Sequence, residues 1–420
     1  MSKFTKLEKQ WILYDVGNSA FTMLVSTIIP IYFKNVASTA GVSSADSTAY
    51  WGYAVSLSTI IVAILGPILG TMADTKGYKK PLFSLFMMLG VVGCAALALP
   101  VPWIIFLAIF VIGKVGFSGS IIFYDAMLND ITTDDRMDEI SSHGFAWGYI
   151  GSCIPFTISL LLVLFAEKFG LTTTNATAIA FLLNAFWWLL ITLPLLKNYK
   201  QKYYIEKGDH PIAESFKRLG NLFLNIRKNK KIFLFLLAFF FYIDGVHTII
   251  SMSTSYGKDV GITDNNLLLA LLLTQIVAFP CAILFGKLSK KFKSDKLIAI
   301  AIIGYIAITI FALQLDKAWE FWLLAVCVAV FQGAIQALSR SYFSKIIPKE
   351  KSSEYFGLYD IFGKGAAFVG TMLMSIATHL TGSSKAGVVG MIVMFVLGLI
   401  TFKAATKVNP SAEAETTISL

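Results

Sequence analysis

Twelve apolar runs, each long enough to cross a lipid bilayer, dominate this chain of 420 residues. A transmembrane α-helix needs about 20 mainly apolar residues. Only 14% of the residues are charged and 56% are hydrophobic, whereas about a quarter of a soluble chain is charged. The sequence therefore predicts an all-α membrane protein and excludes a soluble enzyme or a disulfide scaffold. The predicted spans are 8–34, 50–72, 81–99, 102–127, 142–166, 176–195, 232–256, 264–287, 297–314, 320–343, 355–379 and 386–402.

The positions of the basic residues predict the orientation. Of the 35 lysines and arginines, 27 lie on the side of the predicted membrane that holds both termini, and five lie on the other side. Cytoplasmic loops carry such an excess of positive charge. We therefore expect both termini on the cytoplasmic side of the membrane. The net charge of +10 then reflects topology and attraction to anionic lipid, and it does not indicate nucleic-acid binding.

The only long polar connection divides the chain into two blocks of six spans. We predict an N-terminal bundle at 1–196, a basic linker at 197–231, a C-terminal bundle at 232–403 and a tail at 404–420. Residues 212–224 of the linker fit either a short amphipathic helix on the membrane or a solvated tether.

The two blocks repeat one another. Gly70 to Lys80 matches a segment beginning at Gly286, and Gly144 to Trp147 matches Gly357 to Asp360. Phe123-Tyr124 matches Tyr342-Phe343 at the end of the corresponding span. Tyr14, Asp15 and Asn18 match Tyr242, Asp244 and His247. Four matches in the same order predict two pseudo-symmetric six-helix bundles, the arrangement with which many carriers alternate access to a central site.

The pattern resembles the major facilitator superfamily. Its signature of glycine, aspartate, glycine and a basic cluster is met by Gly70, Asp74, Gly77, Lys79 and Lys80. In physical terms, one glycine allows close helix packing and the other allows a turn, the aspartate can cap a helix amino terminus, and the lysines anchor in headgroups. The resemblance implies a conformational latch at these residues and at Arg340. The second copy has Lys290 in place of the aspartate, so a latch there must work differently.

A narrower resemblance is carried by Trp11 to Phe21, Gly144 to Gly151 and Gln336 to Ser341. These segments look like the bacterial branch related to the fungal vacuolar amino-acid effluxers linked to autophagy. The resemblance implies a carrier in a bacterial cytoplasmic (inner) membrane, related to fungal effluxers of amino acids. Carriers that share one fold nevertheless move unrelated solutes, so the substrate class transfers poorly.

Three charged residues are predicted at the middle of the membrane. Counting about 1.5 Å per residue places Lys114, Asp244 and Lys364 roughly 15 to 18 Å into their spans, and Asp15 and Asp360 lie nearer the cytoplasmic ends. Ionisable groups at this depth are costly and mark candidate functional sites. Asp360 and Lys364 share a helix face, so neutralising one another is an equally good interpretation.

Proton coupling is the energy source we expect, through Asp15, Asp244, His247 and Asp360. Sodium coupling through the oxygens near Asp15 stays open. Uncharged polar residues complete the predicted cavity, although for each one an interhelical hydrogen bond is the simpler interpretation. They are Tyr14, Asn18, Tyr124, Tyr242, Gln332 and Gln336.

Lys114 and Lys364 against Asp244 leave a formal charge of +1 at the middle of the membrane. We therefore predict a secondary transporter for a small zwitterionic or anionic solute, amino acids first, whose carboxylate meets Lys114. A lipid or lysolipid flippase, or a drug exporter, is the alternative on the same fold, and a non-transporting receptor or scaffold is the alternative of another class. Cys94, Cys153, Cys281 and Cys327 lack metal-ligand spacing, and no protease, hydrolase or phosphate-loop sequence is present. We expect no enzymatic activity, metal or cofactor, and a monomer in the bilayer.

Overall fold

The computed structural model describes residues 4–207, 215, 217–222, 226–259, 263–315 and 317–408. They form two compact units. Unit 1 comprises Met1–Thr132, Trp147–Ile212 and Glu350–Gly357, and unit 2 comprises Thr133–Ala146, Ala213–Lys349 and Leu358–Leu420. Within residues 212–224, for which the sequence left two interpretations open, residues 215 and 217–222 are described and are helical.

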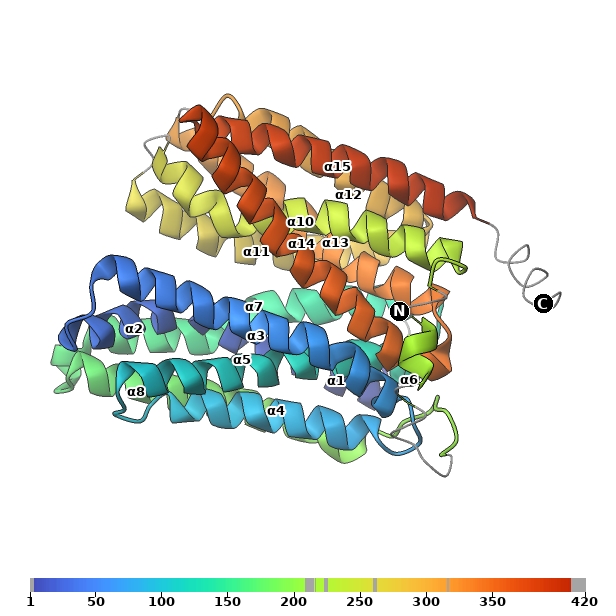
Figure 1. Cartoon of the computed structure of the whole chain (residues 1–420), viewed down its shortest axis with the longest axis horizontal. Helices are drawn as coiled ribbons and strands as arrows, with labels where there is room; N and C mark the ends of the chain where they lie inside the picture. Colours follow the sequence, from blue (N-terminus) through green and yellow to red (C-terminus); the bar gives the residue numbers. More distant parts are fainter. Residues whose placement is uncertain are drawn as a thin grey trace. The chain divides into compact units, whose positions relative to one another are not determined.

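All twelve predicted spans are helical (Figure 1). The first half of the chain contains α1 (Lys6–Ser26), α2 (Ile28–Thr39), α3 (Ser44–Ala73), α4 (Lys79–Ala96), α5 (Trp103–Ala126), α6 (Leu128–Ile131), α7 (Met137–Leu164), η1 (Ala166–Phe169) and α8 (Thr173–Asn198). The second half contains α10 (Lys230–Asp259), α11 (Asp264–Leu288), α12 (Ser294–Ala312), α13 (Ala318–Ile346), η2 (Lys349–Lys351), α14 (Ser352–Thr381) and α15 (Ser384–Lys407).

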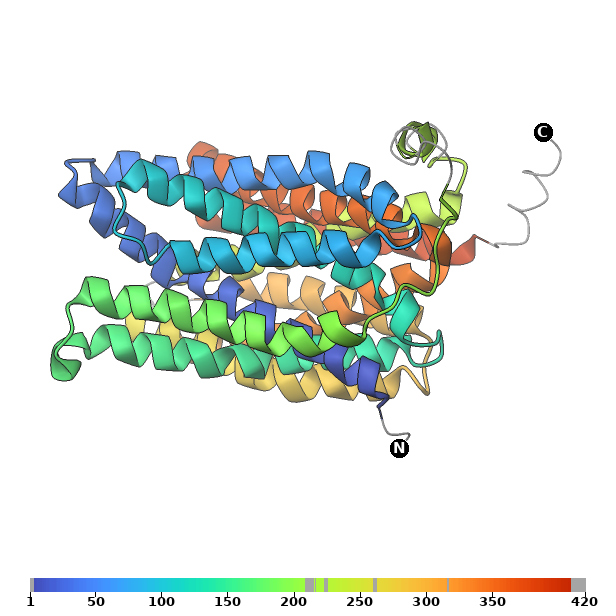
Figure 2. The same cartoon turned by 90° about the horizontal axis from the view of Figure 1, so that it is seen from below.

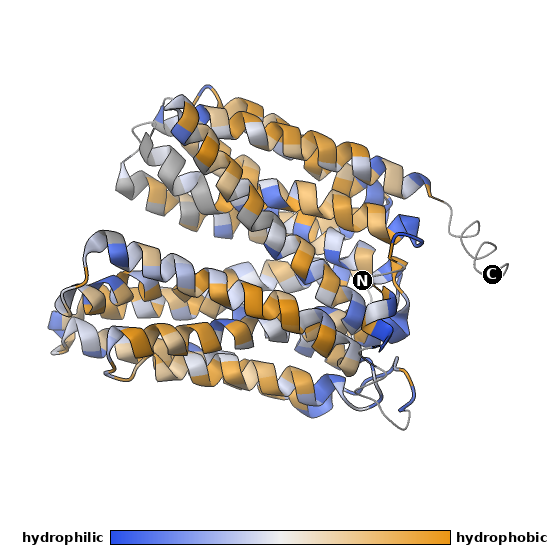
Figure 3. Ribbon diagram, viewed as in Figure 1, coloured by the Kyte–Doolittle hydropathy of each residue, from blue (hydrophilic) through white to orange (hydrophobic). Residues whose placement is uncertain are grey.

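The helices have the length and composition of membrane spans. Among the described residues, ten helices are long and apolar enough to cross a bilayer, and α11 and α14 contain shorter apolar stretches. Hydrophobic residues are spread along the long helices, and many hydrophilic residues gather near the helix ends (Figure 3). The chain is therefore an integral membrane protein with the predicted fold class.

The first predicted span is broken, which differs from the continuous helix expected over 8–34. Helix α1 ends at Ser26 and α2 begins at Ile28, with Thr27 between them outside the helical region of the backbone (φ −137°, ψ −77°). Pro30 explains the break, because its ring collides with the carbonyl group four residues earlier and it has no N–H to donate. That carbonyl group belongs to Ser26.

The two halves pack their helices in the same pattern. In unit 1, α1 packs on α8, α3 on α5, and α4 on both α5 and α8. In unit 2, the helices at the corresponding places in the chain form the same pairs, namely α10 with α15, α11 with α13, and α12 with both α13 and α15. The internal repeat predicted from short sequence matches is thus confirmed by four equivalent helix pairs (Figures 1 and 2).

Helices α7 and α14 each contribute to both units. The first residues of α7, up to Ala146, belong to unit 2 and the rest of the helix belongs to unit 1. Conversely, α14 begins in unit 1 and continues in unit 2 from Leu358. The bundle boundaries predicted from sequence did not anticipate this exchange of helix beginnings.

Glycines allow the closest helix contacts. The Cα atom of Gly113 on α5 occupies the space that a side chain on Gly93 of α4 would need. Gly90 and Gly116 form a second such approach between the same helices. Small residues at these points let the two backbones come together, which is the main source of packing energy between helices in lipid.

The structure predicts that Gly93→Ala destabilises the protein. The added methyl group meets a neighbouring backbone that cannot rotate away, and such overpacking costs about 1–3 kcal/mol. Gly390→Ala in α15 is the matched control, because nothing lies within 4 Å of a Cβ atom there. Thermal unfolding in detergent micelles measures both variants. Equal unfolding temperatures for the two variants would contradict the prediction.

Candidate functional site

The end of α3 holds the beginning of α14 through Asp74. The carboxylate accepts hydrogen bonds from the backbone N–H groups of Ser353 and Glu354, both at 2.9 Å, and Asp74 has no exposed surface. These two N–H groups are among those that a helix leaves without an internal partner. An acid at this position is worth about 0.5–2 kcal/mol as a cap and also complements the helix dipole.

Two glycines shape the segment around Asp74. A side chain on Gly70 would collide with the carbonyl oxygen of Ser353, so glycine is needed for α3 to approach the start of α14. Gly77 has a φ of +83°, a backbone conformation that L side chains rarely adopt, and it turns the chain between α3 and α4. The local geometry is therefore the one that the superfamily signature implies for both glycines and for the aspartate.

Burial changes the acidity of Asp74. Removal from water raises the pKa of this carboxyl group to about 6, and the Lys79 ammonium and the N–H groups of Glu354 and Ser353 offset part of that rise. The group lies just beyond the membrane-spanning part of α3, which ends at Ala73.

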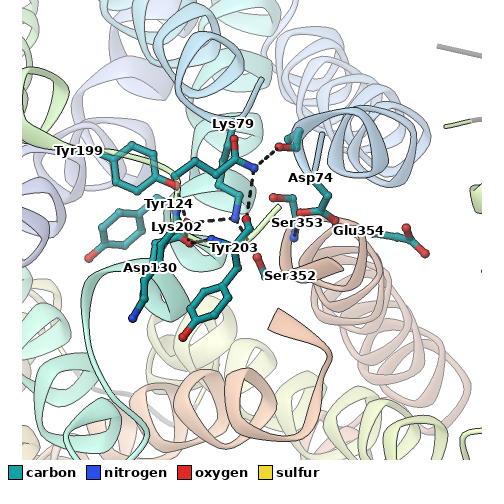
Figure 4. Close-up of polar contacts among 12 residues, drawn as sticks. Asp74, Lys79, Tyr124, Asp130, Tyr199, Lys202, Tyr203, Ser352, Ser353 and Glu354 are labelled. Atoms are coloured by element: carbon teal, nitrogen blue, oxygen red, sulfur yellow. Dashed lines mark hydrogen bonds and ion pairs between the residues drawn. The ribbon is translucent and has the colours of Figure 1, made fainter. Parts of the chain in front are cut away.

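The expectation that the lysines of this segment anchor in lipid headgroups is wrong for Lys79. Its side chain is fully buried, pairs with Asp130 at 3.1 Å and donates to the hydroxyl of Ser352 at 2.9 Å (Figure 4). The physical reason is the carboxylate of Asp130, which compensates the ammonium inside the protein. Removing one partner of a buried pair costs about 3–5 kcal/mol. The side chain of Lys80 is half-buried.

Asp130 joins three parts of unit 1. One carboxylate oxygen accepts from the backbone N–H groups of Lys202 and Tyr203 at 3.1 and 2.9 Å. The other accepts from Lys79 and from the phenol of Tyr199 at 2.5 Å. Burial and the neighbouring Asp130 hold the pKa of Tyr199 well above its ordinary value, so the phenol keeps the proton it donates. Figure 4 shows these groups converging on the carboxylate.

Residues 199–206, here called the strap, follow α8 as an extended segment (Figure 2). Ile205 forms backbone hydrogen bonds with Asp74 and Lys76, at 2.8 and 3.0 Å, in a short parallel bridge. Gln201 accepts from the N–H of Gly77 and donates to the carbonyl of Ala73, both at 3.0 Å. The strap therefore fastens the turn that carries Asp74.

In unit 2, the beginning of α7 is held by α13. Arg340 donates to the hydroxyl and to the carbonyl oxygen of Ser141, at 2.9 and 3.0 Å, and its guanidinium lies 4.3 Å from the centre of the Phe145 ring. Asp138 accepts from Ser341 and Lys345, both at 2.6 Å. The residue predicted from the superfamily resemblance, Arg340, thus binds the first turns of α7.

The repeat places two tyrosines in matching contacts. The hydroxyl of Tyr14 on α1 is 2.6 Å from that of Ser120 on α5, and the hydroxyl of Tyr242 on α10 is 2.6 Å from that of Ser339 on α13. Both tyrosines are fully buried. Tyr124 is also buried and stacks on Trp11, with ring centroids 4.4 Å apart. For Tyr14 and Tyr242 the structure shows the interhelical hydrogen bond that was the simpler interpretation.

Of the predicted amide residues, Asn18 and Gln332 are buried, with 4% and 6% of their surfaces exposed. Gln336 is half-buried and donates to the backbone carbonyl of Gln332 at 3.3 Å. A substrate contact at any of the three stays a prediction.

Asp244 is completely buried on α10, inside unit 2. Its carboxylate accepts from the backbone N–H of Gly370 on α14 at 2.9 Å. A side chain on Gly370 would collide with Asp244 and Thr248, so the glycine makes room for both. A carboxylate at membrane depth thereby joins two helices, a contact that the sequence did not indicate.

Lys364 and Asp360 form the ion pair expected from their spacing on one helix face, with 2.6 Å between nitrogen and oxygen. Both side chains are largely buried, with 26% and 12% of their surfaces exposed. His247 is half-buried, and its electrostatic neighbours are the backbone of Gly363 and the ammonium of Lys364. These residues form one polar cluster in unit 2.

Lys114 and Asp15 are the charged candidates of unit 1. Lys114 is half-buried on α5, and its ammonium lies 5.0 Å from the centre of the Phe117 ring, within the range of a cation–π interaction. Asp15 is half-buried on α1, next to the buried Tyr14. Neither side chain is completely buried, so each leaves part of its surface for a further contact.

An apolar pocket lies within unit 2. It is lined by residues of α10, α12, α13, α14 and α15, among them Ile308, Phe321, Met374 and Met391. Its lining is almost entirely apolar. No group of three or more acidic, histidine or cysteine side chains that could hold a metal ion occurs among the described residues.

Sequence reasoning missed Asp130, Tyr199 and Asp138. Each lies beside rather than within an apolar run, where an acid or a tyrosine is unremarkable. Their partners stand 51 to 207 residues away in the chain. The only available sign for the two acids was their position close to predicted spans, and it did not separate Asp130 and Asp138 from other loop acids.

Comparisons with known proteins agree with this architecture. The family described as vacuole effluxer Atg22 like matches residues 5–415. The chain is 46% identical over 406 residues to the MFS-type transporter YxiO of Bacillus subtilis (strain 168), with 95% of each chain covered.

Two solved structures share the fold. The human organic anion transporter MFSD10 has a TM-score of 0.70 at 13% identity, covering 94% of this chain and 99% of its own. The major facilitator superfamily transporter FucP also has a TM-score of 0.70 at 13% identity, covering 96% and 98%. With the family match over nearly its whole length, the chain belongs to the vacuole effluxer Atg22 like family and is an MFS-type transporter.

Proposed function

We propose that this chain is a proton-coupled secondary transporter of small zwitterionic or anionic solutes, with amino acids first. The observation that carries the proposal is Asp244, a carboxylate buried at membrane depth that bonds the backbone of a second helix. Such a group exchanges its proton with water only when α10 and α14 part. Proton binding and helix movement are then linked, which is the property that a coupling site requires.

The substrate class rests on Lys114. A half-buried ammonium about halfway along α5 offers a charge to a solute carboxylate, and the ring of Phe117 beside it favours a cation at that place. The family, described as vacuole effluxers, supports a solute exporter. MFSD10, which shares the fold, is an organic anion transporter, and an anionic group on the solute agrees with that.

We further propose that Asp74 and Arg340 act as conformational latches, both on the cytoplasmic side of a bacterial inner membrane. Each holds the first turns of a helix that has residues in both units, α14 for Asp74 and α7 for Arg340. Releasing these first turns would permit the rest of each helix to change its surroundings during alternating access.

A second candidate is transport of lipid, lysolipid or apolar drugs. The apolar pocket of unit 2 favours it, because its lining, with Phe321, Met374 and Met391, suits an acyl chain or an aromatic ring.

Flux measurements decide between the two candidates. Purified protein in proteoliposomes with an imposed pH gradient is tested with radiolabelled amino acids, organic acids and lysolipids. We expect gradient-dependent amino-acid flux. Lysolipid movement without amino-acid flux would favour the second candidate, and no flux of any solute would favour a receptor or scaffold.

Replacing Lys114 by alanine should weaken substrate binding. A hydrogen bond to a charged group is worth about 1.5–3 kcal/mol, so KM should rise roughly 10- to 100-fold. Lys385→Ala, which removes a lysine near the start of α15, is the control. An unchanged KM in the folded Lys114 variant would remove this residue from the substrate site.

Replacing Asp244 by asparagine should separate transport from the proton gradient. The amide keeps an acceptor for the N–H of Gly370 but cannot carry a proton. We expect accumulation driven by a pH gradient to vanish while exchange of labelled for unlabelled solute continues. Normal gradient-driven accumulation in Asp244→Asn would contradict the proposed coupling role.

The Asp74 cap should respond to pH. Its pKa is about 6 when buried and about 3.9 when exposed to water, so protonation favours the buried, capped conformation. The stability that proton binding to Asp74 adds to the capped conformation is full below about pH 4 and is lost as the pH rises through about 6. We expect acidification from about pH 7.5 to about 5.5 to slow opening at the start of α14.

Hydrogen exchange of peptides covering 352–358, corrected for the intrinsic effect of pH, measures this opening. Asp74→Asn, which cannot ionise, should lose the pH dependence and serves as the control. Faster opening of the wild type on acidification would contradict the assigned direction.

A further inference from the structure

The second repeat builds the contact of Asp74 again around Lys290. Gly286, the counterpart of Gly70, lies against the beginning of α7, where a Cβ atom on it would be 2.7 Å from the Cβ of Ser142 and 3.5 Å from the Cα of Glu139. Gly70 lies in the same way against Ser353 at the beginning of α14. The segment that follows each glycine therefore meets the first turns of a helix, with Asp74 in one repeat and Lys290 in the other.

The charges of the two contacts are inverted. Asp74 accepts hydrogen bonds from backbone N–H groups, whereas a lysine has only donors and would repel the positive end of a helix dipole. The first turn of α7 contains Asp138 and Glu139, which supply the missing negative charge. Lys290 pairs with Glu139, with 2.8 Å between nitrogen and oxygen.

The two members of this pair differ in exposure. The side chain of Glu139 is 7% exposed and that of Lys290 is 46% exposed. The second acid of the turn, Asp138, is engaged by Ser294, Ser341 and Lys345 instead. Glu139 is thus the group through which the loop after α11 reaches α7.

We propose that Lys290 and Glu139 form a charge-inverted second latch, which positions the beginning of α7 as Asp74 positions that of α14. In this latch the helix carries the acid and the loop carries the base. Its use in a transport cycle rests on the proposed function, but its existence does not. Because the base is half-exposed, this latch is weakened by salt, whereas the buried cap at Asp74 is shielded from it.

The inverted charges predict that restoring the signature residue at position 290 weakens the contact. Lys290→Asp introduces the residue that the superfamily signature has in the first repeat, yet it should release α7, because the new carboxylate faces the buried Glu139. Lys290→Arg should preserve the latch. Lys291→Asp, a change of the same charge at the adjacent exposed lysine, is the matched control.

Hydrogen exchange of the full-length protein in lipid nanodiscs, without any substrate, is the test. In Lys290→Asp we expect peptides covering 137–146 to exchange roughly tenfold faster than in the wild type, the change that follows from about 1.4 kcal/mol of lost stabilisation. The arginine variant and the Lys291 control should match the wild type. Peptides covering 352–358 should be unaffected in all variants.

The double variant Glu139→Lys with Lys290→Glu exchanges the two charges. If the proposal holds, it restores slow exchange at 137–146 relative to either single change. Raising KCl from about 0.1 M to about 1 M, which shortens the Debye length from about 10 to about 3 Å, should speed exchange at 137–146 but not at 352–358.

Unchanged exchange in Lys290→Asp would overturn the proposal. The proposal would also be overturned if peptides covering 137–146 exchanged as fast in the double variant as in the single variants. This criterion also decides the case in which Lys290→Asp accelerates exchange throughout the protein. Because no solute is present, these outcomes are independent of whether the protein transports amino acids. A failed flux assay with the expected exchange pattern would remove the proposed substrate and leave the second latch standing.

Discussion

Two N–H groups at the beginning of α14 have no partner within their own helix, and the carboxylate of Asp74, at the end of α3, accepts a hydrogen bond from each. Much of the surrounding structure maintains that carboxylate in place. Gly70 brings the helices close enough, Gly77 turns the chain, and the strap fastens the turn from the other side. Lys79 adds a second link to α14 through Ser352. Because an uncapped helix end is costly when buried, these residues constrain one another.

The membrane-depth charges have a different physical character. Lys364 is compensated by Asp360 one helical turn away, and Asp244 is compensated mainly by the backbone of Gly370. Insertion of such groups costs energy that their partners only partly return. A backbone N–H cannot neutralise a carboxylate as a lysine can. For this reason Asp244, rather than the Asp360 pair, is the residue on which the proposed proton coupling rests.

The fold was predictable because apolar length alone defines a membrane span, and nothing else in the chain competes with that pattern. The repeat was also predictable, since four short sequence matches recur in the same order, and the matched residues Tyr14 and Tyr242 do have equivalent hydroxyl partners. The break at Thr27 could have been inferred from Pro30, which the prediction of a continuous span passed over.

The networks beside the spans were not predictable in the same way. The position of Lys79 next to a predicted span favours a role as a headgroup anchor. Its burial is explained by the carboxylate of Asp130, which lies 51 residues later in the chain. Likewise, Lys290 is a loop lysine in the sequence and a partner of Glu139 in the structure. Pairings of this kind depend on which helix ends contact one another. A single sequence shows where the charges lie in the chain but not which helix ends are in contact.

The strap also determines where the polypeptide tolerates interruption. Producing the two repeats as separate polypeptides would require a cut in the connection between α8 and α10. A cut immediately after α8 would separate Tyr199, Gln201 and Ile205 from the fragment whose turn they fasten. A break placed beyond Lys207 would leave those bonds on the first fragment. The opening residues of the connection therefore belong to the first repeat in a structural sense, even though they look like the start of a tether.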